Sequence, residues 1–177
     1  MNILFTHSYF YRFDPKQWNN RQPYPPLATI QAASVLRNLG HEVSLFDTAL
    51  LASPDGLNDK LEQTQADILV IYDDGFNYLT KMCLTKMRDA AFDMIHFGKL
   101  HNIPVVVSSS DSTDHYEKYL QCGADAVIIG EGEETLKELI PVISESSHEW
   151  KNIAGLAFMD NGEAVKTANR PVMRNLD

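Results

Sequence analysis

The sequence has only two cysteines, an excess of acid over base and no long hydrophobic run. Cys83 and Cys122 each fall inside a predicted helix and form no Cys-x-x-Cys pair, which excludes a disulfide framework and a thiolate metal site. Lysine and arginine number 15 against 24 acidic residues, and the formal net charge of −9 excludes a phosphate-binding surface for nucleic acid or an anionic membrane. The apolar start at residues 3–5 is too short for a signal peptide, and no later run approaches the length of a membrane span. We therefore expect a cytoplasmic protein with no nucleic-acid and no membrane partner.

Several sequence signatures of catalysis are also missing. The chain has no Walker sequence, no His-Glu-x-x-His zinc motif and no Gly-x-Ser-x-Gly elbow. Asp47 ends the second predicted strand, where a ribose-binding acid stands in a dinucleotide-binding fold. The Gly-rich turn that would cradle the pyrophosphate after the first strand is absent, however, so NAD binding is excluded.

Strands and helices are predicted to alternate along the chain. The 177 residues, 44% of them hydrophobic, can bury the core of one ordinary domain with a small appendage. Short β-prone runs predict strands at residues 3–6, 42–46, 68–72, 105–107 and 126–129. Apolar spacing predicts helices at residues 27–39, 57–65, 80–101, 113–121 and 133–143. This order requires right-handed crossovers and a parallel sheet that is covered by helices on both faces.

The last part of the chain follows a different pattern. After a polar linker at residues 144–148, two β-prone runs at residues 154–158 and 164–167 flank Asn161-Gly162. Asn-Gly is the preferred chemistry for a tight hairpin turn. We therefore divide the chain into an α/β domain at residues 1–148 and a β-hairpin with a connecting segment at residues 149–177, and expect the hairpin to extend the edge of the sheet.

The connection between the first strand and the first helix, residues 6–26, is about twenty residues long, where such loops usually take about two to six. Its length favours a functional role. Two interpretations of its aromatic side chains stay open, because they could stack on a flat ligand or pin the loop to the body of the protein. These side chains are Tyr9, Phe10, Tyr11, Phe13, Trp18 and Tyr24.

Two groups of motifs resemble the N-terminal cobalamin-binding domain of radical SAM enzymes. The first runs from Tyr24-Pro25-Pro26-Leu27 through residues 32–43 to Asp47, and the second is residues 123–135, which include Gly130-Glu131-Gly132. In that family a hairpin like residues 153–162 follows, and a segment like residues 170–177 leads into the radical SAM barrel. The match covers nearly the whole chain, and the order and spacing of the motifs make it specific.

The resemblance implies a flavodoxin-like (Rossmann-like) three-layer sandwich with a five-stranded parallel sheet in the order 2-1-3-4-5. A corrinoid, cobalamin, would lie across the carboxyl ends of the strands. The iron–sulfur cluster and S-adenosylmethionine would belong to the barrel domain, which this chain lacks, since it has no Cys-x-x-x-Cys-x-x-Cys. We therefore expect no catalytic residue in this chain, which would present its cofactor to the barrel for methyl transfer or a related radical reaction.

The resemblance also implies a set of cofactor-binding residues where strands pass into helices. Gly130 and Gly132 permit a positive φ and leave room for a ligand or the neighbouring loop. Glu131 and the acids that follow it favour the helix macrodipole more than acid–base chemistry. The implied cofactor-binding residues are Thr6, His7, Tyr9, Pro25, Pro26, Leu27, Asp73, Asp74, Gly75, Ser108, Ser109, Asp111, Gly130, Glu131 and Gly132.

The chain departs from the family where two glycines commonly follow the fourth strand. Ser108 and Ser109 stand in their place, and Asp111 stands where a histidine is common. The Gly that follows Pro-Pro-Leu in the family is Ala28 here. Two functions therefore stay open, a cobalamin-binding module and a non-catalytic interaction module of the same fold that has lost the corrinoid.

Protein ligands for the cobalt are not evident. The Asp-x-His-x-x-Gly motif that supplies an imidazole is absent, and His96 lies inside a predicted helix. His7, at the mouth of the crevice, is more typical of a hydrogen-bonded loop residue than of a cobalt ligand. We therefore predict no metal ligand from the protein.

Asp73 and Asp74 end the third strand, as the carboxylates of a phosphate-accepting receiver domain do. A receiver also needs acids after the first strand and a lysine after the fifth, and this chain has neither. Two interpretations of this pair stay open, hydrogen bonds to the amide side chains of a corrin and capping of the next helix.

Overall fold

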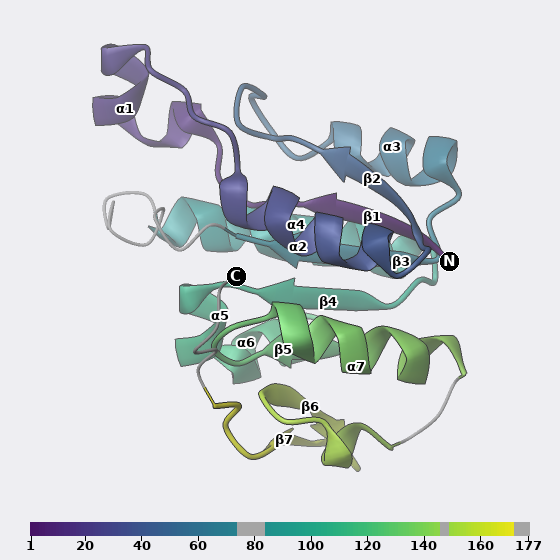
Figure 1. The fold of residues 1–177 in the computed structure, drawn as a ribbon. Coiled ribbons are helices and arrows are strands. Elements are labelled where there is room, and N and C mark those ends of the chain that lie inside the picture. Colours follow the sequence, from purple (N-terminus) through teal and green to yellow (C-terminus); the bar gives the residue numbers. More distant parts are fainter. Residues whose placement is uncertain (74–83, 146–148, 172–177) are drawn as a thin grey trace.

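The computed structural model describes residues 1–73, 84–145 and 149–171. Its strands form one seven-stranded sheet in the order β2-β1-β3-β4-β5-β6-β7 (Figure 1). The first five strands pair in parallel, whereas β6 and β7 pair antiparallel. The strands are β1 (Asn2–Thr6), β2 (Glu42–Phe46), β3 (Ile68–Tyr72), β4 (Val105–Ser108), β5 (Ala126–Ile128), β6 (Leu156–Asp160) and β7 (Glu163–Lys166). The predicted fold class and strand order are confirmed, and the hairpin extends the sheet beyond β5.

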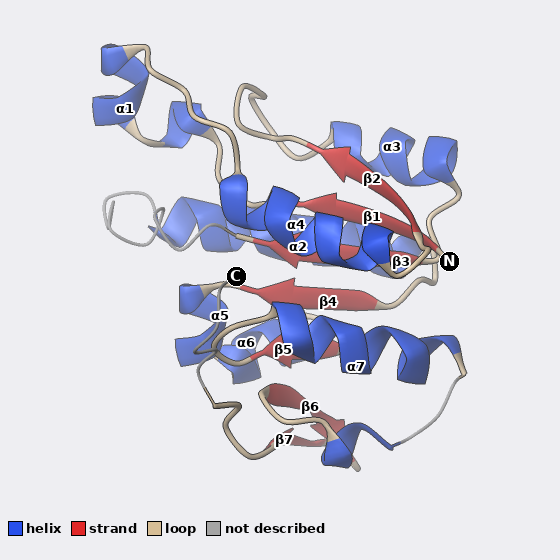
Figure 2. Cartoon of the chain, in the orientation of Figure 1, coloured by secondary structure: helices blue, strands red, loops and turns tan. Residues whose placement is uncertain are grey.

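Helices cover both faces of the sheet and make a three-layer sandwich (Figure 2). One layer of core joins α2 and α7 to the sheet, and the other joins α3, α4 and α6 to it. The central strand β3 is buried at every position because its side chains alternate between these two layers. The helices are α1 (Pro15–Asn20), α2 (Leu27–Asn38), α3 (Gly56–Thr64), α4 (Leu84–Leu100), α5 (Ser110–Asp114), α6 (Tyr116–Gln121) and α7 (Glu133–Ser144), with short 3₁₀ turns η1 (Tyr11–Phe13) and η3 (Glu149–Asn152).

The hairpin turn has the geometry that its sequence predicts. Asn161 and Gly162 have φ values of 50° and 87°. Positive φ at both central residues is the mark of the tight turn that matches the twist of the flanking strands. The loop between β6 and β7 is therefore correctly predicted, although each strand begins one or two residues away from the expected position.

Two helical predictions need correction. The helix expected at residues 113–121 is two short helices, α5 and α6, which divide at His115, where φ is −127° and ψ is 31°. The long loop after β1 contains η1 and the helix α1, which was not predicted. The local signal for α1 is Asp14-Pro15, since Asp14 caps the helix by accepting hydrogen bonds from the amides of Lys16 and Gln17 at 3.1 Å each.

Residues 80–83 of the helix predicted at 80–101 lie outside the described residues.

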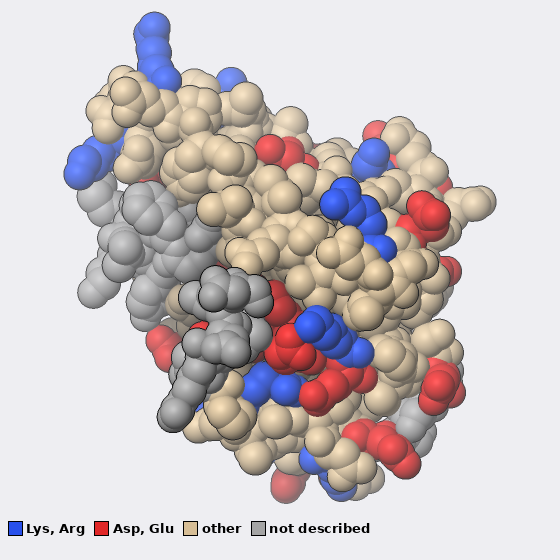
Figure 3. Space-filling view, in the orientation of Figure 1, with Lys and Arg blue, Asp and Glu red and all other residues tan. Residues whose placement is uncertain are grey.

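Charges of both signs are mixed on the surface that carries α7 (Figure 3). Lys137 pairs with Glu134, and Arg170 pairs with Glu138 at 2.6 Å. Arg170 also donates to the Thr135 hydroxyl at 2.9 Å, which holds the segment after β7 against α7. In the part of the chain that the structure describes, no helix has both the length and the apolar character needed to cross a bilayer.

Close packing between α4 and the sheet predicts the effect of a substitution at Gly98. A methyl group there would overlap Cγ2 of Val105 and lie 3.3 Å from Cδ2 of Leu69. Alanine normally stabilises a helix interior by about 1 kcal/mol relative to glycine. We expect Gly98→Ala to lower the free energy of unfolding instead, by about 1–3 kcal/mol, because the added methyl overpacks the interface.

Urea unfolding followed by circular dichroism measures this change. Thr85→Ala, at an exposed position of the same helix, is the matched control and should change the free energy of unfolding by no more than about 0.5 kcal/mol. An increase in stability for Gly98→Ala would contradict the close contact.

Candidate functional site

The loops that follow the parallel strands meet along the carboxyl edge of the sheet. The Thr6 hydroxyl is buried and donates to the carbonyl of Phe46 at 2.9 Å, which joins the ends of β1 and β2. The Asp73 amide donates to the carbonyl of Ser108 at 2.8 Å, which joins the ends of β3 and β4. Ser8 joins the β1 loop to Asp73. The predicted residues of β1, β3 and β4 are therefore brought together at one edge.

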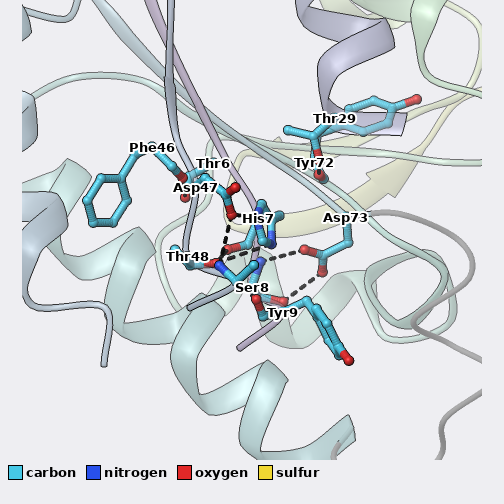
Figure 4. Close-up of polar contacts among 11 residues, drawn as sticks. Thr6, His7, Ser8, Tyr9, Thr29, Phe46, Asp47, Thr48, Tyr72 and Asp73 are labelled. Atoms are coloured by element: carbon cyan, nitrogen blue, oxygen red, sulfur yellow. Dashed lines mark hydrogen bonds and ion pairs between the residues drawn. The ribbon is translucent and has the colours of Figure 1, made fainter. Parts of the chain in front are cut away.

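His7 is held on both sides of its imidazole ring (Figure 4). Nε2 lies 3.0 Å from Oδ1 of Asp47, and Nδ1 lies 3.2 Å from Oγ1 of Thr48. The ring is 1% exposed, and the Thr48 hydroxyl also lies 2.7 Å from the carbonyl oxygen of His7. The hydrogen bond with His7 lowers the pKa of Asp47. Both ring nitrogens are engaged, so His7 anchors the loop after β1, as the sequence interpretation favoured.

Asp73 points toward Ser8 in the loop after β1 (Figure 4). Its two carboxylate oxygens accept hydrogen bonds from the amide of Ser8 at 2.6 Å and from the Ser8 hydroxyl at 2.7 Å. Burial raises the pKa of Asp73, against the opposing effect of the two Ser8 hydrogen bonds. Asp73 thus ties the β1 loop to β3, while Asp74 and Gly75 lie outside the described residues.

Several aromatic side chains of the long loop are buried. Tyr9, Phe10 and Tyr11 are 3%, 0% and 2% exposed. Tyr9 stacks on Tyr24 with ring centroids 5.7 Å apart, and Tyr11 meets Trp18 edge-on at 5.8 Å. These contacts favour the pinning interpretation for the buried rings, including the predicted site residue Tyr9. Trp18 is 41% exposed, and the guanidinium of Arg12 lies 4.7 Å from the centroid of its ring.

The Pro25-Pro26-Leu27 motif sets the start of α2 at this edge. Pro26 precedes the helix, and its carbonyl accepts the amide of Ile30 at 3.0 Å. Within the first turn of the helix, the Thr29 hydroxyl donates to the carbonyl of Tyr72 at 2.5 Å and fixes α2 to the end of β3. Leu27 is 65% exposed, so the motif presents an apolar side chain at the rim of the edge.

Ser109 and Asp111, two departures from the family pattern, build the helix α5. Ser109 and Ser112 form a capping box, in which each amide donates to the other residue's hydroxyl, at 2.9 and 2.8 Å. Asp111 accepts hydrogen bonds from Nε of Arg88 at 2.7 Å, from its terminal guanidinium nitrogen at 2.5 Å, and from the Tyr119 hydroxyl at 2.7 Å. Burial alone would raise the pKa of Asp111, but the bonds from Arg88 and Tyr119 bring it below its ordinary value. Sequence reasoning missed Arg88 and Tyr119, which lie inside predicted helices without a local signal.

Gly130 and Gly132 are needed for different reasons. Gly130 has a φ of +84°, whereas the φ of −99° at Gly132 does not require glycine. Only Gly130 therefore uses the positive φ that glycine permits. A methyl group at Gly132 would lie 2.6 Å from Cε2 and 2.7 Å from the hydroxyl oxygen of Tyr72, so the Tyr72 ring excludes a side chain there. Tyr72 was predicted only as a strand residue.

A hollow of about 370 Å³ opens on the carboxyl edge between α5 and the turn after β5. We call it the edge hollow, and its wall carries hydroxyls, carboxylates and backbone. Nothing lies within 4 Å of the position that a methyl group on Gly130 would take, so this residue faces open space. The lining residues are Ser109, Ser110, Thr113, Asp114, Gly130 and Glu131. Among the described residues, no cluster of three or more His, Cys, Asp or Glu side chains could hold a metal ion.

The chain is similar in sequence to a much longer protein. It is 30% identical over 161 residues to an uncharacterized methyltransferase, PH0819, of Pyrococcus horikoshii, and the aligned part is 86% of this chain and 32% of that protein. The chain therefore spans about a third of the length of this relative. No family model matches the chain.

Solved structures share the fold. TsrM of Kitasatospora setae, a radical S-adenosylmethionine methyltransferase with cobalamin and a [4Fe-4S] cluster bound, matches 99% of this chain over 30% of its own, with a TM-score of 0.73 and 17% identity. OxsB, a cobalamin-dependent S-adenosylmethionine radical enzyme with aqua-cobalamin and S-adenosylmethionine bound, matches 97% of this chain over 22% of its own, with a TM-score of 0.69 and 18% identity. The resemblance predicted from the motifs is confirmed at the level of the fold.

Asp111 and Asp73 are expected to change stability with pH in opposite directions. The folded-state pKa of Asp111 lies below the ordinary value of 3.8, so the stability that its ionised form contributes is lost as the pH falls below about 3.8. The folded-state pKa of Asp73 is raised above 3.8, so its ionisation opposes folding, and the fold loses stability as the pH rises from about 3.8 through that pKa.

Urea unfolding between about pH 3 and pH 7 separates the two effects. At neutral pH we expect Asp111→Asn to be less stable than the parent chain by about 1–3 kcal/mol, with a deficit that shrinks toward pH 3. The stability of Asp73→Asn relative to the parent chain should increase as the pH rises. Asp89→Asn, at an exposed position of α4, is the matched control, and parallel pH dependence of the two site variants would contradict the assignment.

Proposed function

We propose that this chain is the cobalamin-binding module of a radical SAM enzyme. It holds the corrinoid over the carboxyl edge of its sheet and presents it to a catalytic barrel elsewhere in a longer protein. The edge hollow carries this proposal, because it lies at the place where ligands bind open α/β sheets. The iron–sulfur cluster and S-adenosylmethionine belong to the barrel in this proposal.

The residues of the edge hollow fit the periphery of a corrin ring. A corrin carries amide side chains that both donate and accept hydrogen bonds, and Ser109, Ser110 and Thr113 offer hydroxyls while Glu131 offers a carboxylate. Gly130 faces open space, which lets a flat ring approach the backbone. When bound, the cobalt of the corrinoid would carry the group or electron that is transferred.

The predicted site residues divide into two roles in this proposal. Leu27, Ser109, Gly130 and Glu131 line the exposed rim and would touch the corrinoid. A buried set, whose polar groups bond within the protein, would hold the loops that bear the rim. The supporting residues are Thr6, His7, Asp73, Ser108 and Asp111. Because both nitrogens of His7 are engaged, the cobalt would receive no imidazole from it.

One observation favours the alternative, a non-catalytic interaction module. The hydroxyl of Ser109 caps α5 and the carboxylate of Asp111 binds Arg88, so side chains serve the fold at positions where the family commonly has glycine and histidine. These contacts stabilise the fold whether or not a ligand is bound. Corrinoid binding distinguishes the two functions.

The first test is a titration of the chain with hydroxocobalamin. We expect saturable one-to-one binding with a Kd on the order of micromolar, which corresponds to about 8 kcal/mol. The visible spectrum of the corrinoid and the quenching of tryptophan fluorescence report it, with an unrelated flavodoxin-like protein as the control. Absence of binding at high micromolar concentration, in this chain and in the longer parent protein, would favour the interaction module.

The second test compares two glycines with the same backbone strain. Gly130 and Gly162 have φ values of +84° and +87°, and a methyl group on either would meet nothing within 4 Å. Replacement of each by alanine should therefore cost similar stability, about 1 kcal/mol. Only Gly130 faces the edge hollow, so we expect Gly130→Ala to weaken hydroxocobalamin binding about tenfold, which is about 1.4 kcal/mol.

Gly162→Ala, in the hairpin turn, is the matched control and should leave the Kd unchanged. Thermal unfolding of both variants measures the loss of stability that alanine causes at a positive φ. Equal effects of the two substitutions on binding would argue against corrinoid contact at Gly130.

A further inference from the structure

We infer that Tyr72 is a specificity-determining residue that keeps the nucleotide arm of a corrinoid out of the body of the domain. The chain would then hold a corrinoid by its ring and bind cobinamide, which lacks the arm, as tightly as cobalamin. This inference rests on the proposed function.

Cobalamin has two parts that a protein can contact. One is the corrin ring with its amides, and the other is a flexible arm that ends in a ribonucleotide of dimethylbenzimidazole. A ring that lies on the carboxyl edge of a sheet can send its arm into the protein only through a seam between the sheet and a covering helix. The chain has two such layers of helices, so two seams must be considered.

The Tyr72 ring closes the seam on the face covered by α2 and α7. Tyr72 ends the central strand β3, belongs to the core layer that includes α2 and α7, and is 6% exposed. Its ring lies so close to Gly132, just before α7, that a single methyl group would not fit between them. The Thr29 hydroxyl of α2 donates to the backbone carbonyl of Tyr72 at 2.5 Å. The ring thus fills the place where α7 begins above the end of β3.

Polar groups surround the Tyr72 hydroxyl. The Gly132 amide, the Ser108 hydroxyl and the Glu133 carboxylate lie near it, and burial raises its pKa. Ser108, itself 5% exposed, stands where the family commonly has the first glycine of a pair. Together, the phenol and the serine hydroxyl occupy space that two smaller residues would leave open.

On the opposite face, polar contacts cross the mouth of the seam. Asp111 is held by Arg88 and by the Tyr119 hydroxyl, and Asp73 is held by Ser8. A benzimidazole arm that entered here would break the Arg88–Asp111 ion pair and the hydrogen bonds of Asp73, which is unfavourable because these groups are largely removed from water. The arm is therefore excluded from both seams of the described structure.

Among the described residues, the edge hollow lies outside the body of the domain. The edge hollow, about 370 Å³, is lined by polar groups of the rim and suits ring amides. A larger hollow of about 570 Å³ is lined by Asp125 and Asp160. These residues precede β5 and end the antiparallel β6, so that hollow lies at the opposite end of the strands. The arm of a bound cobalamin would stay in solvent.

The test compares corrinoids with and without the arm on the unaltered chain. Hydroxocobalamin and diaquacobinamide are titrated separately, and α-ribazole, the nucleoside of the arm, is added as a competitor. We expect the two Kd values to agree within about threefold, which is less than 1 kcal/mol, and α-ribazole to displace neither corrinoid. Cobalamin binding tenfold or more tighter than cobinamide binding, or displacement by α-ribazole, would overturn the inference.

A pair of variants tests the residue itself. Tyr72→Ala should open the seam and improve cobalamin binding relative to cobinamide binding about tenfold, or about 1.4 kcal/mol. Tyr72→Phe keeps the ring and is the matched control, with a ratio of Kd values like that of the parent chain. Circular dichroism establishes whether Tyr72→Ala folds. If it does not fold, the titrations of the unaltered chain with hydroxocobalamin and diaquacobinamide test the inference. An unchanged ratio in folded Tyr72→Ala would show that Tyr72 does not exclude the arm.

The outcomes also separate this inference from the proposed function. If both corrinoids bind and cobalamin is strongly preferred, the cofactor module stands and the role of Tyr72 is wrong. If neither corrinoid binds to the chain or its longer parent protein, the proposed function is wrong and the inference falls with it.

Discussion

The end of the central strand β3 fixes both faces of the domain. Tyr72 is the last residue of β3 and Asp73 follows it, and their side chains contact different parts of the protein. The Tyr72 ring lies against Gly132 at the start of α7, and the Tyr72 carbonyl receives the Thr29 hydroxyl of α2. The Asp73 carboxylate receives two hydrogen bonds from Ser8. Two consecutive residues thus set the positions of the loops that form the candidate site.

Local sequence signals predicted most of the fold. Apolar runs such as residues 68–72 and the Asn161-Gly162 turn act over a few neighbouring residues, and the structure agrees with them closely. The contacts that shape the site are of another kind. Arg88 and Asp111 are 23 residues apart, and their ion pair leaves no trace in the spacing of either helix. The same is true of Tyr72 and Gly132, since the need for glycine comes from a ring sixty residues away.

The departures from the family pattern make sense once their partners are known. A glycine pair leaves a loop free to approach a ligand, whereas Ser109 caps α5 and Asp111 binds it to α4 through Arg88. The wall of the edge hollow is therefore a capped, ion-paired helical turn instead of a bare loop. A rigid wall loses little conformational entropy when it meets a ligand, which favours binding even where fewer atoms make contact.

A glycine in a motif of this kind usually makes room for a ligand, whereas Gly132 makes room for the ring of Tyr72. The two residues form one unit, because the ring needs the absence of a side chain at Gly132 and the glycine would leave a gap if the ring were smaller. Gly130, two residues earlier, faces open space and has the positive φ that requires glycine for the backbone alone. One motif therefore serves two purposes, with Gly130 shaping the outer surface and Gly132 completing the core. In the proposed complex the boundary between ligand and protein would run between these two glycines, and a corrinoid held outside it would be recognised by its ring.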